Sequence, residues 1–259
     1  MKKSKIAVLV AMVVVLAFSL AACGGSDKSS SDKTVYKVGT EPTFPPFDTT
    51  DEDQNIVGLD MDLIKAIGED QDFDVEFENL SFDGLIPALK AGNIDIVAAG
   101  MNKDDEDRQK EVDFSDSYYE SKLFVAVTED NTTIKSVEDL TPDMKVAAQT
   151  GTTGASKVKE LKDAGKIKEA VILDGLDTCM MKLINGDVSA VINEKPVTEA
   201  YMKKQPDKIK MVGEALNAEN YGFAVQKGNA ELVEKINNGL KHIKENGTYD
   251  KLVDEWFNK

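Results

Sequence analysis

The sequence predicts an α/β protein with mainly parallel sheets, built as two lobes. From residue 35 onward, short β-branched runs alternate with helical patterns, and this alternation is typical of parallel strands joined by helices. Two apolar runs that read alike, LFVAV at 123–127 and GFAVQ at 222–226, each follow a candidate crossing between lobes. With 259 residues and 41% hydrophobic side chains, the chain can build one large domain or two modest ones.

Individual elements follow from local pattern. Strands are expected at the β-branched runs 35–40, 73–78, 94–99, 123–128, 145–149, 170–173, 188–192 and 222–226. Helices are expected where apolar residues recur at helical spacing, at 59–69, 83–91, 155–164, 177–185, 196–203, 229–246 and 249–257. Ser81 is expected to cap the helix at 83–91, because its hydroxyl can accept from the first free N–H groups.

The chain is expected to cross between the lobes twice, through hinge strands at 118–122 and 217–221. Lobe 1 is then discontinuous and consists of 34–117 and 222–259, whereas lobe 2 is 123–216. Sheets of this class bind ligands at the carboxyl ends of parallel strands. A ligand is therefore expected in the crevice between the lobes.

Residues 1–22 have the form of a secretory signal peptide. Lysines near the start precede an apolar run that ends in LAAC, and a polar stretch rich in Ser, Asp and Lys follows. This ending resembles the lipobox of bacterial lipoproteins, whose cysteine is lipidated and starts the mature chain. The resemblance implies a palmitate-bearing lipid anchor on Cys23, with a flexible tether completing 23–33. A plain cleaved signal is the alternative.

Composition excludes several classes of function. The 31 basic and 47 acidic side chains give a formal charge of −16, which disfavours nucleic acid, because phosphate binding needs basic patches. The two cysteines, Cys23 and Cys179, and the single histidine, His242, cannot form a zinc cluster. Asp51 begins a calcium-like loop, but Ile56 occupies the position that needs glycine. We expect no metal and no cofactor, a buried Cys179, and no catalytic role for His242.

One basic residue is singular. Of the 31 basic side chains, 30 are lysine, and the only arginine is Arg108. A guanidinium grips a carboxylate with two parallel hydrogen bonds, which an ammonium cannot do. A genome that uses little arginine, with Arg108 retained by chance, explains the count equally well. Arg108 follows the strand at 94–99 through an acidic loop, after Gly100 and Asn102, where backbone can approach a ligand closely.

Acidic and aromatic side chains follow other strands of the first half. The strand at 35–40 runs into a proline-rich loop that presents Glu41, Phe44 and Phe47, and Phe82 opens a helix after the next strand. An aromatic ring supplies a flat apolar wall at small entropic cost. We expect Phe44 in the cleft and Phe47 in the core, with Phe82 as a second wall.

The second half supplies an anion site and another carboxylate. The strand at 145–149 runs into TGTTG, with Thr152 and Thr153 directly before a helix. Free N–H groups at a helix N-terminus bind anions, and without a Gly-Lys-Ser/Thr ending the anion is a carboxylate rather than a phosphate. Asn193 and Glu194 end the strand at 188–192. An arginine, a helix end, a carboxylate and aromatic walls together fit a zwitterionic amino acid.

These residues lie in segments that resemble the polar amino acid substrate-binding proteins of ABC importers, solute-binding protein family 3. The matching segments are GTEPTFPPF at 39–47, GLDMDLIKAIG at 58–68, FDGLIPALKAGNIDIVAAGM at 82–101, VDFSDSYY at 112–119, QTGTTG at 149–154 and ENGTYDKLVDEWF at 245–257. The resemblance implies a periplasmic-binding-protein-like fold whose two lobes close on one amino acid. It also implies a lipid-anchored monomer on the outer face of the cell membrane, partnered by ABC permease subunits.

The resemblance also implies roles for individual residues. By position in the matching segments, the α-carboxylate is expected to be held by Arg108 and by the backbone and hydroxyl of Thr153. Glu194 is expected to face the α-ammonium group. The side-chain pocket is expected to be formed by Phe44, Phe82, Glu41 and Gln149. The chain departs from the family in having Glu194 for the usual aspartate and Asn102 for a common hydroxyl, and its loop at 100–108 is one residue longer.

The expected ligand carries a cationic side chain, arginine or lysine, with glutamine next. Glu41 would attract a cation and would repel glutamate. An alternative is a dehydratase-like enzyme on the same fold, with Glu194 as general acid. A further alternative is a sensory or surface lipoprotein that does not transport. We expect a binding protein and no enzyme.

Overall fold

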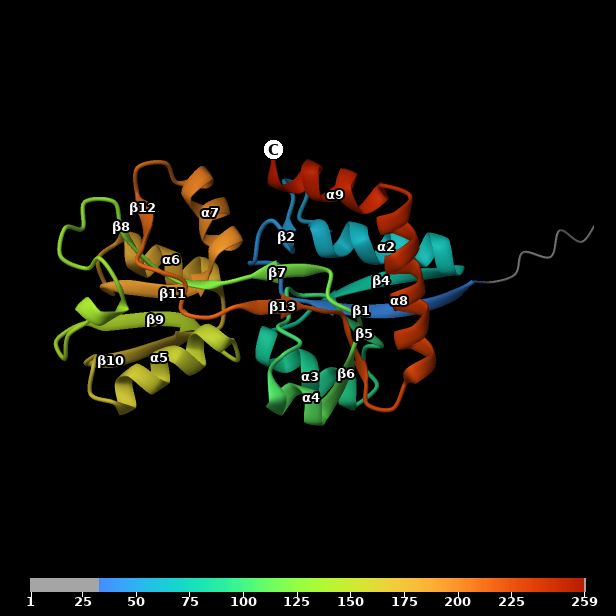
Figure 1. Cartoon of the computed structure of the whole chain (residues 1–259), viewed down its shortest axis with the longest axis horizontal. Helices are drawn as coiled ribbons and strands as arrows, with labels where there is room; N and C mark the ends of the chain where they lie inside the picture. The colour runs from blue at the N-terminus through green and yellow to red at the C-terminus, as the bar shows by residue number, and fades with distance from the viewer. Residues whose placement is uncertain (1–32, 259) are drawn as a thin grey trace, which may run out of the picture. The chain divides into compact units, whose positions relative to one another are not determined.

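The computed structural model describes residues 33–258 and contains two five-stranded sheets (Figure 1). The expected signal peptide, Cys23 and most of the expected tether lie outside the described residues. Residues Thr34–Lys259 belong to one compact unit, and everything below concerns this unit.

The first sheet has the strand order β4-β1-β5-β14-β6. In that order the strands are Phe73–Asn79, Thr34–Thr40, Ile96–Val97, Ala224–Gln226 and Val112–Phe114. Strand β1 pairs in parallel with β4 and β5, whereas β14 is antiparallel to both of its neighbours. Four strands therefore run in one direction and β14 runs in the other.

Helices cover both faces of this sheet (Figure 1). On one side lie α2 (Leu59–Gln71), α8 (Ala230–Glu245) and α9 (Thr248–Phe257). On the other side lie α3 (Phe82–Lys90) and α4 (Glu106–Glu111). The two faces bury separate clusters, since Val38 and Ile96 pack with α2 and α8, whereas Val97 packs with Leu85 of α3.

The second sheet repeats this design, with the strand order β10-β9-β11-β8-β12. In that order the strands are Glu169–Leu173, Lys145–Gln149, Ala190–Glu194, Leu123–Thr128 and Ile209–Val212. Only β8 runs against the others, because it is antiparallel to both β11 and β12. The reversed strands β8 and β14 are the two apolar runs that read alike in the sequence.

The second sheet is also covered on both faces, by α5 (Thr153–Asp163) on one side and by α6 (Leu176–Ile184) and α7 (Lys195–Lys204) on the other (Figure 1). Alternating residues of β9 show this, because Val146 packs with α5 and Ala147 with α6. Cys179 of α6 is fully buried, as expected.

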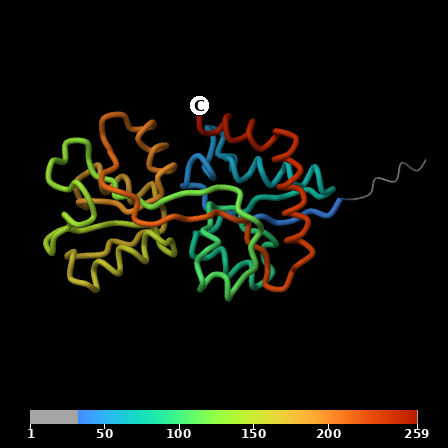
Figure 2. The backbone as a smooth tube through the Cα atoms, viewed as in Figure 1, coloured from blue at the N-terminus to red at the C-terminus, as the bar shows by residue number. Residues whose placement is uncertain are grey.

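Two short strands connect the sheets, β7 (Tyr119–Ser121) and β13 (Glu219–Tyr221), which pair antiparallel. Figure 2 shows the chain passing between the sheets along these two segments. We call the part around the first sheet lobe 1 and the part around the second sheet lobe 2; the lobe limits given above remain predictions. The remaining elements are β2 (Thr49–Thr50), β3 (Ile56–Val57) and the 3₁₀ turn η1 (Val137–Asp139).

Several elements differ from the expectation. Helix α4 and strands β6 and β12 were not expected, and the strand expected at 94–99 is only Ile96–Val97. Ser81 occupies the cap position of α3, but its side chain makes no capping hydrogen bond. None of the described helices has the length and apolar character needed to cross a membrane.

Candidate functional site

A small cavity lies where the two lobes meet. It is lined by nine of the eleven expected binding residues, namely Phe44, Phe82, Gly100, Asn102, Arg108, Gln149, Thr152, Thr153 and Glu194. Its volume is about 10 Å³, which holds about one water molecule. The lobes are therefore closed around the cavity in this structure, and a molecule larger than water can enter only when they separate.

Arg108 crosses the boundary between the lobes. Helix α4 presents it from lobe 1, and the cap residue Asp105 accepts hydrogen bonds from the backbone N–H groups of Asp107 and Arg108. Its Nη2 donates to the carbonyl oxygen of Gly151 in lobe 2 at 2.9 Å, and its Nη1 donates to the carbonyl oxygen of Asn102 at 3.2 Å. Arg108 is only 8% exposed, so burial lowers the pKa of its guanidinium, while Asp105 and other acidic neighbours raise it. Arginine stays charged in such an environment.

The N-terminus of α5 faces the guanidinium across the cavity. Thr152 caps this helix, because its hydroxyl accepts from the backbone N–H of Ala155 at 3.0 Å and donates to the carbonyl oxygen of Gln149 at 2.8 Å. Its hydroxyl is thus committed to the helix. Thr153, the first helical residue, lines the cavity. A β-carbon on Gly154 would lie 2.7 Å from the carbonyl oxygen of Ile192, so only glycine lets the helix end pack this closely on β11.

Phe44 and Phe82 form apolar walls of the cavity. The guanidinium carbon of Arg108 lies 5.3 Å from the centroid of the Phe82 ring, a cation–π geometry that fixes both groups. Phe44 lines the cavity at 6% exposure, whereas Phe47 is fully buried among aromatic rings, and both placements match the expectation.

Gly100 lines the cavity on the lobe 1 side. Its φ of +54° is left-handed, and a β-carbon there would lie 2.7 Å from the Phe44 ring. The backbone N–H of Gly100 donates to Asp60 Oδ2 at 2.8 Å, and the Tyr118 hydroxyl donates to the same oxygen at 2.6 Å. Asp60 is fully buried, and burial raises its pKa to about 7 despite these hydrogen bonds.

Glu41 lies directly behind the cavity and does not line it. Its Oε2 accepts from the Thr43 hydroxyl at 2.8 Å and from Gln149 Nε2 at 2.6 Å, so it joins the lobes through Gln149. Burial raises the pKa of Glu41, and the negative charge of Asp177 adds to this effect, while the two hydrogen bonds oppose it. The region behind Gln149 is thus acidic.

Glu194 brings a buried carboxyl group to the cavity lining itself. It is 4% exposed, and burial raises its pKa well above the usual range, with the neighbouring charge of Glu219 as the next cause. The positive charge of Arg108 acts in the opposite direction.

The two remaining amide residues are placed differently from each other. Asn102 lines the cavity, and its Oδ1 accepts from the backbone N–H of Asp104 at 3.0 Å. Asn193 does not line the cavity, because its Nδ2 donates to the Thr198 hydroxyl at 3.2 Å and to the carbonyl oxygen of Glu194. Asn193 therefore fastens the end of β11 to α7.

Sequence reasoning did not single out Asp60, Glu219 or the capping residue Asp105. Asp60 and Glu219 are almost completely buried, at 0% and 1% exposure. A weak signal for Asp60 exists in the sequence, since Asp60 and Asp62 alternate with the apolar Leu59 and Met61 in the first turn of α2. Nothing comparable marks Glu219, whose burial depends on strand pairing between distant segments.

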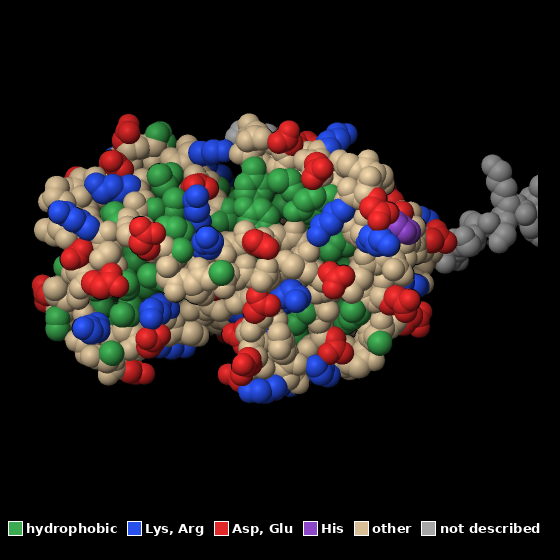
Figure 3. Space-filling model, viewed as in Figure 1, with side chains coloured by type: hydrophobic (Ala, Val, Ile, Leu, Met, Phe, Trp, Pro, Cys, Tyr) green, Lys and Arg blue, Asp and Glu red, His purple; other side chains and the backbone are tan. Residues whose placement is uncertain are grey.

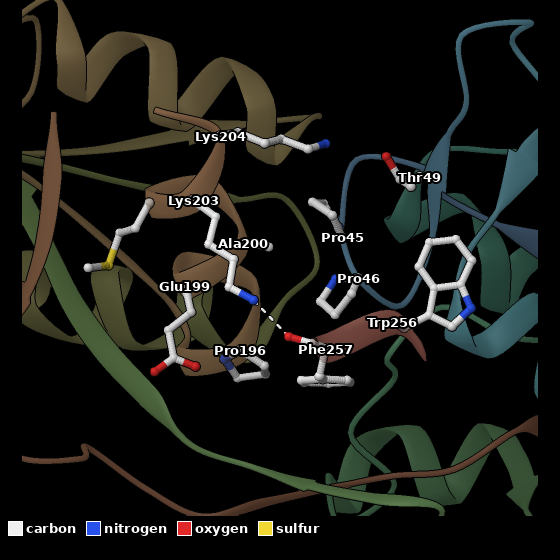
Figure 4. A pocket seen from close by; sticks show the side chains of 11 residues that line it. Pro45, Pro46, Thr49, Pro196, Glu199, Ala200, Lys203, Lys204, Trp256 and Phe257 are labelled. Atoms are coloured by element: carbon white, nitrogen blue, oxygen red, sulfur yellow. Dashed lines mark hydrogen bonds between the residues drawn. The ribbon is translucent and has the colours of Figure 1, made fainter. Parts of the chain in front are cut away.

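A much larger groove lies elsewhere between the lobes. It has a volume of about 610 Å³ and is lined by Pro45, Pro46, Thr49, Pro196, Glu199, Ala200, Met202, Lys203, Lys204, Trp256 and Phe257 (Figure 4). Hydrophobic side chains gather on this face of the molecule between α7 and α9 (Figure 3). Lys203 Nζ donates to the Phe257 carbonyl oxygen at 2.7 Å across the groove. None of the expected binding residues lines it.

The alternative sites are unsupported by geometry. Asp51 Oδ1 accepts from the backbone N–H groups of Asp53 and Asn55, as in an ordinary polar turn. His242 Nδ1 lies 2.7 Å from Asp70 Oδ2 on an exposed helix face. Among residues 33–258, no three His, Cys, Asp or Glu side chains are arranged to hold a metal ion.

Comparisons with known proteins agree on one family. Residues 36–259 match the model of the bacterial extracellular solute-binding proteins, family 3. The chain is 33% identical over 252 residues to a probable histidine-binding protein of Neisseria gonorrhoeae, covering 94% of this chain and 92% of that protein. It is 34% identical over 265 residues to a putative ABC transporter arginine-binding protein 2 of Escherichia coli (strain K12), covering 100% of both.

A solved structure shows the same fold. An ancestral arginine-binding protein bound to arginine superimposes with a TM-score of 0.82 at 44% identity, covering 87% of this chain and 99% of that one. The expected two-lobed, periplasmic-binding-protein-like α/β fold is confirmed. Because the family model covers nearly the whole described chain, the protein belongs to the bacterial extracellular solute-binding proteins, family 3.

Proposed function

We propose that the protein is the extracytoplasmic substrate-binding component of an ABC importer and captures a free polar amino acid between its lobes. The observation that carries this proposal is the buried guanidinium of Arg108, which faces the N-terminus of α5 across the closed boundary. A guanidinium and free helix N–H groups on opposite sides make a clamp for one carboxylate. Relatives named as arginine-binding or histidine-binding proteins support the ligand class.

Each part of the ligand then has a partner. The α-carboxylate takes the place that the Gly151 carbonyl oxygen now occupies at Arg108 Nη2, and it also meets Thr153. The α-ammonium group meets Glu194. The side chain extends between Phe44 and Phe82 toward Gln149.

The acidic region behind Gln149 favours a cationic side chain. Burial is the largest cause of the raised pKa values of Glu41 and Asp48, and negative neighbours add to it, namely Asp177 at Glu41 and Asp60 and Glu41 at Asp48. A guanidinium or ammonium placed against Glu41 relieves this repulsion. Arginine or lysine is therefore the preferred ligand, and glutamine, which can exchange hydrogen bonds with Gln149, comes next.

The ligand drives closure because it bridges the lobes. Arg108 and Phe44 belong to lobe 1, whereas Thr153 and Glu194 belong to lobe 2. A ligand shifts an open–closed equilibrium only through its greater affinity for one state, and only the closed state offers both halves of the clamp. A permease can then distinguish loaded from empty protein by closure, with the lipid on Cys23 keeping the protein at the membrane.

A thermal-shift screen of the twenty amino acids tests this function. A ligand at 100 times its dissociation constant stabilises by about 2.7 kcal/mol, which raises Tm by several degrees. We expect the largest shifts with arginine and lysine and a smaller shift with glutamine. Absence of a shift with every amino acid would contradict the proposal.

The dehydratase alternative has one observation in its favour. Burial raises the pKa of Glu194, as a general acid requires. We nevertheless expect no product when a cyclic dienyl acid is incubated with the protein, and chromatographic detection of an aromatic product would decide for the enzyme.

A further inference from the structure

Glu219 of the connecting strand β13 has one buried carboxylate oxygen that accepts no hydrogen bond from the described residues. The side chain is 1% exposed, and its Oε1 accepts from Asn217 Nδ2 at 2.9 Å. Its Oε2 has no hydrogen-bond donor among the described residues. A buried carboxylate oxygen without a partner is costly, so a proton or a cationic group is expected at this point.

Strand pairing brings this oxygen to Glu194. Leu123 pairs with Glu194 in the second sheet, and Ser121, two residues earlier, pairs with Glu219 in the connecting strands. Burial is the largest cause of the raised pKa of Glu194, and the neighbouring Glu219 raises it further, both through its negative charge and as a side-chain hydrogen-bonding neighbour. Two ionised carboxylates cannot hydrogen-bond, because both only accept.

The charges around the pair leave room for one proton. Arg108 of α4 interacts electrostatically with both carboxyl groups, and both also raise the pKa of the Tyr221 hydroxyl of β13, after burial as the largest cause. Asp105 is a third carboxylate that interacts electrostatically with the same guanidinium group. One positive charge shared among three carboxylates does not balance two adjacent buried anions, so the pair is stable when one of them is protonated.

We propose that Glu219 is a positioning residue of the binding site, which shares one proton with Glu194 until the ammonium group of a bound amino acid takes that proton's place. The ammonium group keeps its three protons and donates to the two carboxylates, and the shared proton leaves to solvent. Ligand binding at neutral pH then releases about one proton per molecule. The part that concerns the ligand rests on the proposed function.

The shared proton is tested first without ligand. Infrared spectroscopy of the full chain at neutral pH detects the carbonyl stretch of protonated carboxyl groups. In Glu219→Gln, Glu194 faces Arg108 alone and ionises, so we expect the band to lose the intensity of one carboxyl group. The amide can donate to Glu194 in place of the proton, so the variant should fold, as circular dichroism can check. Glu194→Gln gives the reciprocal loss.

A matched control lies on the neighbouring strand. Glu120 of β7 is an exposed glutamate that pairs with Asn220, and Glu120→Gln should leave the band unchanged. An unchanged band in folded Glu219→Gln would overturn the shared proton.

The second arm measures proton release with L-arginine as the probe. Calorimetry in two buffers of different ionisation enthalpy should show release of about one proton by the wild type and Glu120→Gln, and none by Glu219→Gln. Binding without proton release in the wild type overturns the proposal while leaving the proposed function standing. No binding of L-arginine contradicts the proposed ligand, and the infrared result alone then decides the shared proton.

Discussion

At the scale of single residues, the candidate site depends on groups that are expensive to bury. Arg108, Glu194 and Glu41 are each less than one-tenth exposed. Burial raises the pKa of both glutamates, and the positive charge of Arg108 offsets only part of this effect at Glu194. Such groups cost stability unless they are paired, which favours a role in binding over a role in folding.

Arg108→Lys tests whether the ligand carboxylate needs the two parallel hydrogen bonds of a guanidinium group. An ammonium keeps the charge but cannot donate two parallel hydrogen bonds to one carboxylate. We expect the affinity for L-arginine to fall at least tenfold, which corresponds to about 1.4 kcal/mol. Isothermal titration calorimetry measures it, with Lys110→Ala on the exposed face of α4 as the control. Equal affinity in wild type and Arg108→Lys would remove Arg108 from the site.

Glu41→Gln tests the origin of the cationic preference. The variant keeps the hydrogen-bonding groups around Gln149 but removes the negative charge. We expect the affinity for arginine to fall at least tenfold, or about 1.4 kcal/mol, while the affinity for glutamine changes less. The exposed Glu52→Gln serves as the control in the same titrations. A proportional loss for both ligands would show that Glu41 does not select charge.

At the scale of elements, the sequence predicted long, patterned segments well and short charged ones poorly. Helix α8, with its regular apolar face, was expected within one residue at each end. Helix α4 has no apolar face, and its formation depends on the cap from Asp105 and on the position that Arg108 takes across the lobes. Strand β12 forms because its backbone pairs with that of β8. The local sequence does not reveal this pairing.

Nine of the expected binding residues line the cavity, and they could be selected from the sequence because they lie at strand ends or in the segments after them, where α/β sheets bind ligands. Asn193 follows the same rule but turns toward Thr198, since adjacent residues of a strand point to opposite faces. Glu219 was not predictable, because its contact with Glu194 depends on the register of two strand pairs.

The buried carboxyl group of Asp60, which accepts from Gly100 and Tyr118, makes stability depend on pH. Its folded-state pKa of about 7 exceeds the unfolded value near 3.8. The stabilising contribution of its protonated form is therefore complete below about pH 4 and is lost as pH rises through about 7. Each pKa unit corresponds to about 1.4 kcal/mol, so the decline amounts to a few kcal/mol.

Asp60→Asn mimics the protonated acid and should flatten this decline, because the amide oxygen can still accept from Gly100 and Tyr118. Urea unfolding across the same pH range measures the slope, with the exposed Asp74→Asn as a control that keeps the wild-type slope. The buried Asp48 contributes a remaining slope in both variants. A variant as pH-dependent as the wild type would show that Asp60 is ionised throughout.

At the scale of the whole molecule, the two lobes close on a space too small for an amino acid. Cross-lobe hydrogen bonds, from Arg108 to Gly151 and from Gln149 to Glu41, occupy groups that the proposed ligand needs. Tyr201 of lobe 2 also donates to the Thr43 carbonyl oxygen at 2.9 Å. A ligand bound in the proposed way must therefore compete with these cross-lobe contacts.

A crystal structure grown with L-arginine tests the proposed binding mode most directly. We predict that the α-carboxylate lies between the Arg108 guanidinium and the N-terminus of α5, with the ammonium group at Glu194 and the Gly151 carbonyl released from Arg108. Arginine bound with its carboxylate away from Arg108, or only in the apolar groove beside Trp256, would contradict it.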